Sequence, residues 1–193
     1  MNIELIEKHR DINTDFNWWE CTEEHTKEHL RSEYGFAMDE LQWSGFCSQG
    51  DGASFTGAVW EFSTLINKHK ELLDAAPVLC KLILADKADL SFRLVRGDSH
   101  YSHENTVAAE MSFNMTFADI FDDDDSPALL IERAVQTYVD INELGSFEKA
   151  ILELLKDKMR KVYQDLEAEY EHLTSDEVVW ETIVDNELHK EEA

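Results

Sequence analysis

The feature that most constrains the fold is an alternation of apolar and polar residues over positions 107–117. Apolar side chains occupy every second position, namely Val107, Ala109, Met111, Phe113, Met115 and Phe117. Because successive side chains of a β-strand point to opposite faces of a sheet, this pattern predicts a strand with one buried face. A shorter alternation over 90–94 predicts a second strand, and the turn formers at 96–105 are expected to join the two as a long hairpin loop.

A second hairpin is predicted around the string Ser48-Gln49-Gly50-Asp51-Gly52, which has aromatic and small residues on both sides between positions 41 and 62. Asp-Gly favours a tight hairpin turn because both positions tolerate positive φ. Together the two hairpins predict an antiparallel sheet of about four strands.

Helical periodicity covers much of the remaining chain. Apolar residues recur at spacings of three and four in three segments: 63–85 with an interruption at Pro77, 127–143 and 147–170. A further helix is predicted over 22–31, where Glu23 and Glu24 lie in the first turn and Gly35 follows soon after the end. Thr22 is the expected N-cap of the first helix, and Gly145-Ser146 is expected to end one helix and cap the next. The string from Thr174 to Glu177 matches a capping box before a last helix.

These elements predict the α+β fold class, with the sheet packed against several helices. The sequence contains no internal repeat, and no linker is long enough to divide it into separate domains. We therefore expect a single acidic domain over residues 1–193, with C-terminal helices from about 127 to 188.

Charge excludes one class of function and suggests another. The chain has 17 Lys and Arg against 42 Asp and Glu, a formal net charge of −25. Binding to nucleic-acid phosphates depends on Lys and Arg, so direct DNA or RNA binding is not expected. No apolar run reaches the roughly 18 residues of a membrane span, and the first residues lack a signal-peptide pattern. We expect a cytoplasmic protein without membrane contact, and the three unpaired cysteines agree with a reducing compartment.

The glycine-rich turn is the first candidate site. Ser48, Gln49 and Asp51 would lie at a hairpin tip, where Gly50 and Gly52 allow a ligand or a partner backbone to approach closely. The alternative is structural: Asp51 caps its own turn and the glycines serve close packing.

The second candidate site is the loop with His100 and His103, which lie near Asp98 and Glu104. These residue types suit a divalent metal or acid–base catalysis. We hypothesise that the two hairpin tips meet and bring Asp51, His100 and His103 together as catalytic groups, the two histidines being the candidate metal ligands. The alternative is a solvated loop.

Two further patterns have weaker implications. His25 and His29 are four residues apart on one helix face, a spacing that can chelate a metal. The acidic run 122–125 has oxygen ligands for Ca²⁺ or Mg²⁺ but lacks EF-hand spacing, and its simplest role is to place negative charge at a helix N-terminus. Phosphate-binding glycine motifs are absent, so the sequence identifies no cofactor.

The string from Trp43 to Gly57, WSGFCSQGDGASFTG, resembles the signature of a poorly characterised family encoded largely by bacteriophages and prophages. Its pattern is SGF-x-SQGDGA-x-F-x-G, and its members are sometimes labelled as toxin–antitoxin related. Further strings extend the resemblance over most of the chain: Gly35-Phe36, Tyr101-Ser102-His103, Met111 and Thr174-Ser175-Asp176-Glu177. Cys47 stands where a bulky aromatic residue is usual. The resemblance implies a phage-type protein in the host cytoplasm and no established activity.

Without a catalytic motif, net charge becomes the leading indication of function. An acidic surface attracts basic partners and can present carboxylates where DNA would present phosphates. We expect a phage-type accessory protein that binds and modulates or inhibits a host protein, such as a nucleic-acid-binding enzyme. The alternatives are a small metal-dependent or His/Asp-dependent hydrolase acting on a nucleotide or nucleic acid, and an antitoxin-like regulator. The sequence does not set the oligomeric state.

Overall fold

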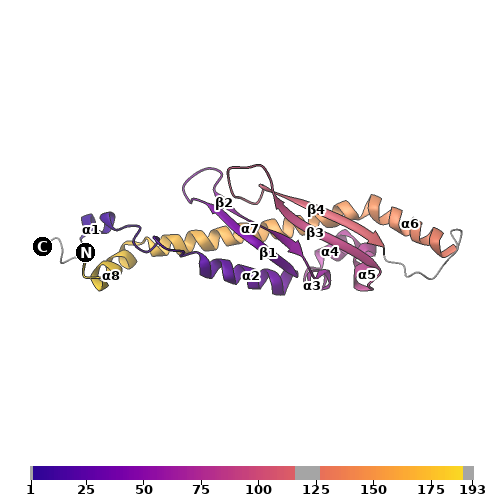
Figure 1. Ribbon diagram of the computed structural model, residues 1–193, viewed down its shortest axis with the longest axis horizontal. Helices are drawn as coiled ribbons and strands as arrows, with labels where there is room; N and C mark the ends of the chain where they lie inside the picture. Colours follow the sequence, from indigo (N-terminus) through magenta and orange to yellow (C-terminus); the bar gives the residue numbers. More distant parts are fainter. Residues whose placement is uncertain (1, 116–126, 189–193) are drawn as a thin grey trace. The chain divides into compact units, whose positions relative to one another are not determined.

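The computed structural model describes residues 2–115 and 127–188 (Figure 1). Over these residues the order of elements is α1 (Ile3–Lys8), α2 (Glu20–Tyr34), β1 (Phe36–Ser44), β2 (Gly52–Val59), α3 (Phe62–Lys68), α4 (Glu71–Ala75), α5 (Pro77–Leu84), β3 (Ala88–Arg96), β4 (Val107–Met115), α6 (Pro127–Asn142), α7 (Leu144–Leu173) and α8 (Asp176–Asp185). The predicted α+β class is confirmed.

The four strands form one antiparallel sheet in the order β1-β2-β3-β4. β1 and β2 pair from Phe36↔Val59 to Ser44↔Gly52, with a bulge between Met38 and Glu40. β3 and β4 pair along their whole length, whereas β2 and β3 are joined only at residues 57–59 and 92–94. Both predicted hairpins are confirmed, and they form a single sheet.

The alternating pattern of β3 and β4 separates a core face from a solvent face. Phe92, Leu94 and Phe113 are buried, whereas Arg93 and its cross-strand partner Glu110 are exposed. The core face packs against the apolar stripe of α7 and against helices α2 to α5. The stripe consists of residues that are 0% exposed: Phe147, Ile151, Leu155 and Met159.

The chain divides into two compact units. The larger unit is Lys27–Arg160, and the smaller unit combines Met1–Thr26 with Lys161–Ala193, of which 2–26 and 161–188 are described. The small core of the smaller unit joins α1 to α8 through four residues: Leu5, Ile6, Val179 and Ile183.

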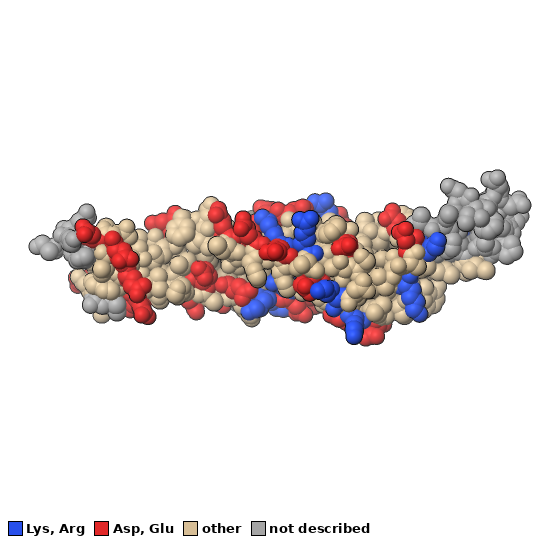
Figure 2. All heavy atoms as spheres, turned by 90° about the horizontal axis from the view of Figure 1, so that it is seen from below, with Lys and Arg blue, Asp and Glu red and all other residues tan. Residues whose placement is uncertain are grey.

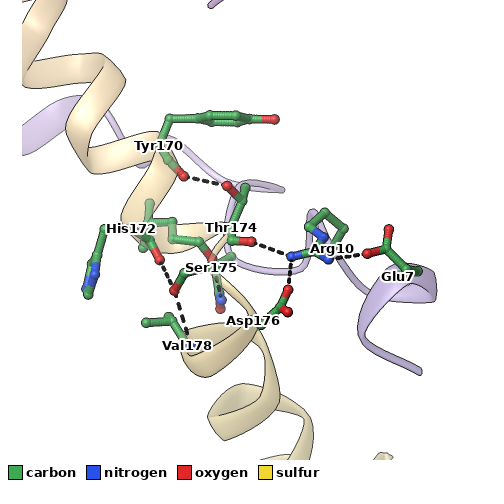
Figure 3. Close-up of polar contacts among 10 residues, drawn as sticks. Glu7, Arg10, Tyr170, His172, Thr174, Ser175, Asp176 and Val178 are labelled. Atoms are coloured by element: carbon green, nitrogen blue, oxygen red, sulfur yellow. Dashed lines mark hydrogen bonds and ion pairs between the residues drawn. The ribbon is translucent and has the colours of Figure 1, made fainter. Parts of the chain in front are cut away.

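Arg10 adds a polar connection inside the smaller unit (Figure 3). Its guanidinium donates to the Thr174 carbonyl at 2.9 Å and to the Asp176 carboxylate at 2.5 Å, and it also pairs with Glu7. The hydrogen bonds to Asp176 and then Glu7 raise the pKa of Arg10 above its usual value. The side chain therefore links the end of α1 to the start of α8.

No helix in the described ranges combines the length and the apolar character needed to cross a membrane.

Several predicted helix boundaries are wrong. Helical hydrogen bonding begins earlier than expected, with Glu23 N donating to Trp19 O at 3.0 Å, so Thr22 lies inside α2 and does not cap it. The N-cap of α8 is Ser175, whose hydroxyl accepts from Val178 N at 3.4 Å (Figure 3). Thr174 instead donates its hydroxyl to the backbone of the preceding helix.

The segment 63–85 forms three short helices, α3, α4 and α5. Pro77 is the first residue of α5, a position at which no N–H donor is needed. Gly145 and Ser146 do not separate two helices, because Phe147 N donates to Glu143 O at 2.9 Å and both residues lie in the first turn of α7.

Glu143, the residue between α6 and α7, is buried at 3% exposure. Its carboxylate accepts hydrogen bonds from Val78 N at 3.0 Å and Leu79 N at 2.8 Å. These N–H groups begin α5, whose N-cap residue Ala76 has no side-chain acceptor. Because a negative charge is favourable at a helix N-terminus, Glu143 serves as the cap from 64 residues away.

We expect Glu143→Ala to lower the free energy of unfolding by about 2–3 kcal/mol, because two buried donors lose a charged acceptor. Glu143→Gln keeps an acceptor oxygen without the charge and should cost about 1 kcal/mol. Urea denaturation measures both, with the exposed Glu153→Ala on α7 as the control. Equal destabilisation by Glu143→Ala and Glu153→Ala would contradict this capping role.

Cys80 on α5 is fully buried, and its thiol donates to Leu72 O at 3.3 Å. Burial, and then the charge of Glu143, raise the pKa of Cys80 from 9.0 to about 12. The folded state therefore favours the neutral thiol, and this contribution to stability is lost as the pH rises from about 9 towards 12.

At pH 8 we expect a thiol-reactive disulfide reagent to modify the exposed Cys21 and Cys47 in the folded protein, and Cys80 only after unfolding. Thiol titration with and without denaturant measures this difference. In Cys80→Ala the additional thiol released by denaturant should disappear. Rapid modification of three thiols in the native protein would show that Cys80 is accessible.

Candidate functional site

The loop between β1 and β2 is closed by the side chain of Asp51. Its Oδ2 accepts hydrogen bonds from Cys47 N at 3.0 Å and Ser48 N at 2.6 Å, and Asp51 N donates to Ser48 O at 3.1 Å. Gly50 has φ +105°, a conformation that favours glycine. The carboxylate of Asp51 thus holds its own turn.

The two hairpin loops lie against each other. A Cβ built on Gly50 would lie 3.5 Å from the ring of Tyr101, and one on Gly52 would lie 2.5 Å from Cβ of His103. At the base of the loops Ser44 Oγ donates to the Ser102 carbonyl at 3.5 Å. The glycines of the SQGDG turn therefore provide the space into which the second loop packs.

His103 is held within its own loop. Its Nδ1 accepts a hydrogen bond from Asn105 N at 3.1 Å, and its carbonyl accepts one from the Thr106 hydroxyl at 2.7 Å. His100 is exposed and lines an open pocket of about 480 Å³ together with residues 96–99. Among the described residues no hydrogen bond or ion pair joins Asp51, His100 and His103.

Within the described ranges no group of three or more His, Cys, Asp or Glu side chains is arranged to hold a metal ion. His29 lies against the ring of Tyr34, with 5.8 Å between ring centroids. The acidic run 122–125 lies outside the described residues.

Helix α7 anchors the second loop. Lys156 Nζ donates to Asn105 Oδ1 at 3.2 Å, and Arg160 lies 3.6 Å from Glu104. Arg160 also pairs with Asp157, whose hydrogen bond is the main cause of the raised pKa of Arg160. The spacing of four places Lys156 and Arg160 on one helix face, but nothing in the sequence shows that this face meets the second loop.

The paired loops, defined as residues 45–51 and 97–106, form a platform. Its base includes Trp43 and Phe46, whose rings stack with centroids 5.3 Å apart. Ser48 and Gln49 are exposed, and their side chains have no polar partner among the described residues. Tyr101, which is 51% exposed, lies next to them against Gly50. This arrangement can offer hydrogen-bonding groups and an aromatic ring to a partner.

We expect Gly52→Ala to lower the free energy of unfolding by about 1–3 kcal/mol, because the added methyl overlaps His103 at 2.5 Å. Gly145→Ala is the matched control, since a Cβ there meets nothing within 4 Å and helical alanine stabilises by up to about 1 kcal/mol. Thermal or urea denaturation compares the two variants. Undiminished stability of Gly52→Ala would mean that the loops do not pack closely.

Comparisons with known proteins give one match. A family model described as a domain of unknown function, DUF8835, matches residues 18–176. This span contains both hairpins and the whole of the platform's supporting helix α7. No curated protein and no solved structure matches the chain. Because the matched residues make up well over half of its length, the chain belongs to the DUF8835 family.

Proposed function

We propose that the protein is a phage-type accessory protein that binds and modulates a basic host protein, with carboxylates in the place of nucleic-acid phosphates. The observation that carries this proposal is the uneven distribution of charge between the two units. The resemblance of the SQGDG string to a phage signature supports the assignment to a phage-type protein.

Acidic residues dominate the smaller unit. Its described residues include 16 Asp and Glu but only 3 Lys and Arg, whereas those of the larger unit include 19 and 13. Arg10 is paired with Asp176, and Lys161 is paired with Asp165 at 2.9 Å. Figure 2 shows one face of the protein, on which Asp and Glu (red) occur from left to right, while Lys and Arg (blue) are seen in the centre and at the right.

The position of some acids lowers helix stability. Glu167, Glu169 and Glu171 lie in the last two turns of α7, which ends at Leu173. The C-terminus of a helix has a partial negative charge that acts over about one turn, so the carboxylate of Glu171 is unfavourable there. An acid at such a position does not help the helix to fold, which favours a role in binding.

An acidic surface of this kind suits the groove of a nucleic-acid-binding enzyme. Coulomb attraction raises the association rate with a basic groove and is screened over about 10 Å at 0.1 M salt. A partner held in this way would be lost at high salt and would bind its nucleic acid less well in the presence of the protein.

The test is affinity capture from a bacterial lysate at about 50 mM and about 500 mM salt, with mass spectrometry of the bound proteins. We expect one stoichiometric partner at low salt that is lost at high salt. The variant Glu169→Gln/Glu171→Gln/Glu181→Gln, which neutralises three exposed acids of the smaller unit, should capture at least tenfold less of it.

The matched control is Glu28→Gln/Asp89→Asn/Glu153→Gln, which removes the same charge from exposed positions of the larger unit. This variant should capture the partner almost as well as the wild type. Equal capture by both variants, or a complex insensitive to salt, would contradict binding through the acidic unit. Absence of any partner at either salt concentration would overturn the proposal.

A further inference from the structure

We propose that a pocket of the larger unit binds a nucleoside monophosphate, independently of the acidic surface described above. The pocket has a volume of about 410 Å³ and is lined by Lys27, Arg31, Phe36, Ala37, Met38 and Trp60. This volume lies in the usual range for small-molecule sites, roughly 300–1,000 Å³. The site combines an exposed indole with two cations in a chain of strongly negative net charge.

Trp60 supplies the aromatic surface. The residue is 55% exposed, and its backbone N–H donates to the Gly35 carbonyl at 2.8 Å. Gly35 ends α2 with φ +55°, and a Cβ there would lie 2.2 Å from the Glu61 carbonyl oxygen. The glycine thus lets the chain after β2 pack directly against the end of α2, which holds the indole beside this helix.

Arg31 supplies the principal cation. Its guanidinium carbon lies 5.8 Å from the centroid of the Trp60 ring. Although acids outnumber bases 42 to 17 in this chain, the Arg31 side chain has no hydrogen bond or ion pair with any residue in the described ranges. A cation–π contact uses the charge of the guanidinium and leaves its in-plane N–H groups able to bind an oxyanion.

The second cation is Lys27, one helical turn before Arg31 and therefore on the same side of α2. Two cations on adjacent turns match the charge of a phosphate monoester, and Arg binds phosphate oxygens in a bidentate manner. Met38, which is partly exposed, adds apolar surface to the same pocket, and the fully buried Phe36 lies beneath it.

The remaining feature, the exposed indole, selects a ligand with a flat ring. Bases stack on tryptophan with little dependence on their identity, so a nucleobase fits this surface. The net charge of −25 repels a polynucleotide, which carries one phosphate per residue. A ligand with one base can stack on the indole, and its single phosphate meets much less repulsion than a polynucleotide does.

The test is an NMR titration of ¹⁵N-labelled protein with AMP and with UMP. The indole N–H signal of Trp60 is identified by its loss in Trp60→Phe. We expect this signal to shift on addition of either nucleotide with a Kd below about 1 mM, and at least tenfold weaker binding of inorganic phosphate or of adenosine.

Arg31→Gln should weaken AMP binding at least tenfold, with an unchanged melting temperature as evidence of folding. Arg133→Gln is the matched control, because Arg133 is also exposed and has no ion pair with a described residue. Its binding of AMP should equal that of the wild type. The proposal is overturned if the Trp60 signal stays fixed up to roughly 5 mM AMP, if phosphate binds as tightly as AMP, or if a single-stranded oligonucleotide binds more tightly.

Discussion

Burial of one sheet face against helix α7 is the interaction on which the rest of the larger unit depends. The two hairpins share only three residue pairs, between 57–59 of β2 and 92–94 of β3. Such a short ladder cannot by itself fix the position of one hairpin relative to the other. Phe55 from the first hairpin and Phe92 from the second are instead buried in one core with Phe147 and Ile151 of α7. The helix therefore sets the geometry of the sheet, and with it the contact between the two loops.

The most distinctive string of the sequence proves to describe packing. Gly50 and Gly52 leave room for Tyr101 and His103, and Asp51 closes the turn between them. A side chain at either glycine would separate the loops. What remains free for recognition is a smaller set of groups, the exposed side chains of Ser48 and Gln49. Within this turn, residues 50–52 serve packing and closure, and the two residues before them keep exposed side chains.

Periodicity in the sequence predicted the strands, both hairpins and the stripe of α7, because each of these depends on spacing within one segment. Helix ends were predicted less well. Ser175 and not Thr174 caps α8, since Thr174 bonds back to Tyr170. No local pattern shows that Glu143 caps α5, because the two are joined only when α6 and α7 fold back on that helix.

The sequence predicted which loops would carry the candidate site. It did not predict the contacts that hold those loops to the rest of the protein. The sequence placed polar residues at two hairpin tips, and their contact followed as a hypothesis from the sheet. The anchoring of the second loop by Lys156 and Arg160 joins positions more than fifty residues apart and has no sequence signal. Net charge was known from composition, whereas its concentration in one unit was not, because that unit combines residues 2–26 with 161–188.

That discontinuity has a consequence for biosynthesis. The larger unit is a continuous stretch, 27–160, so all its residues are synthesised before the last part of α7 and before α8. In the smaller unit α1 packs against α8, whose residues are translated more than 160 positions later. This unit therefore cannot fold until α8 has been made. Since compact units fold as their chains become complete, the larger unit, with 19 Asp and Glu against 13 Lys and Arg among its described residues, forms before the more acidic smaller unit. A nascent chain would therefore acquire its strongest electrostatic field only after α8 has been translated.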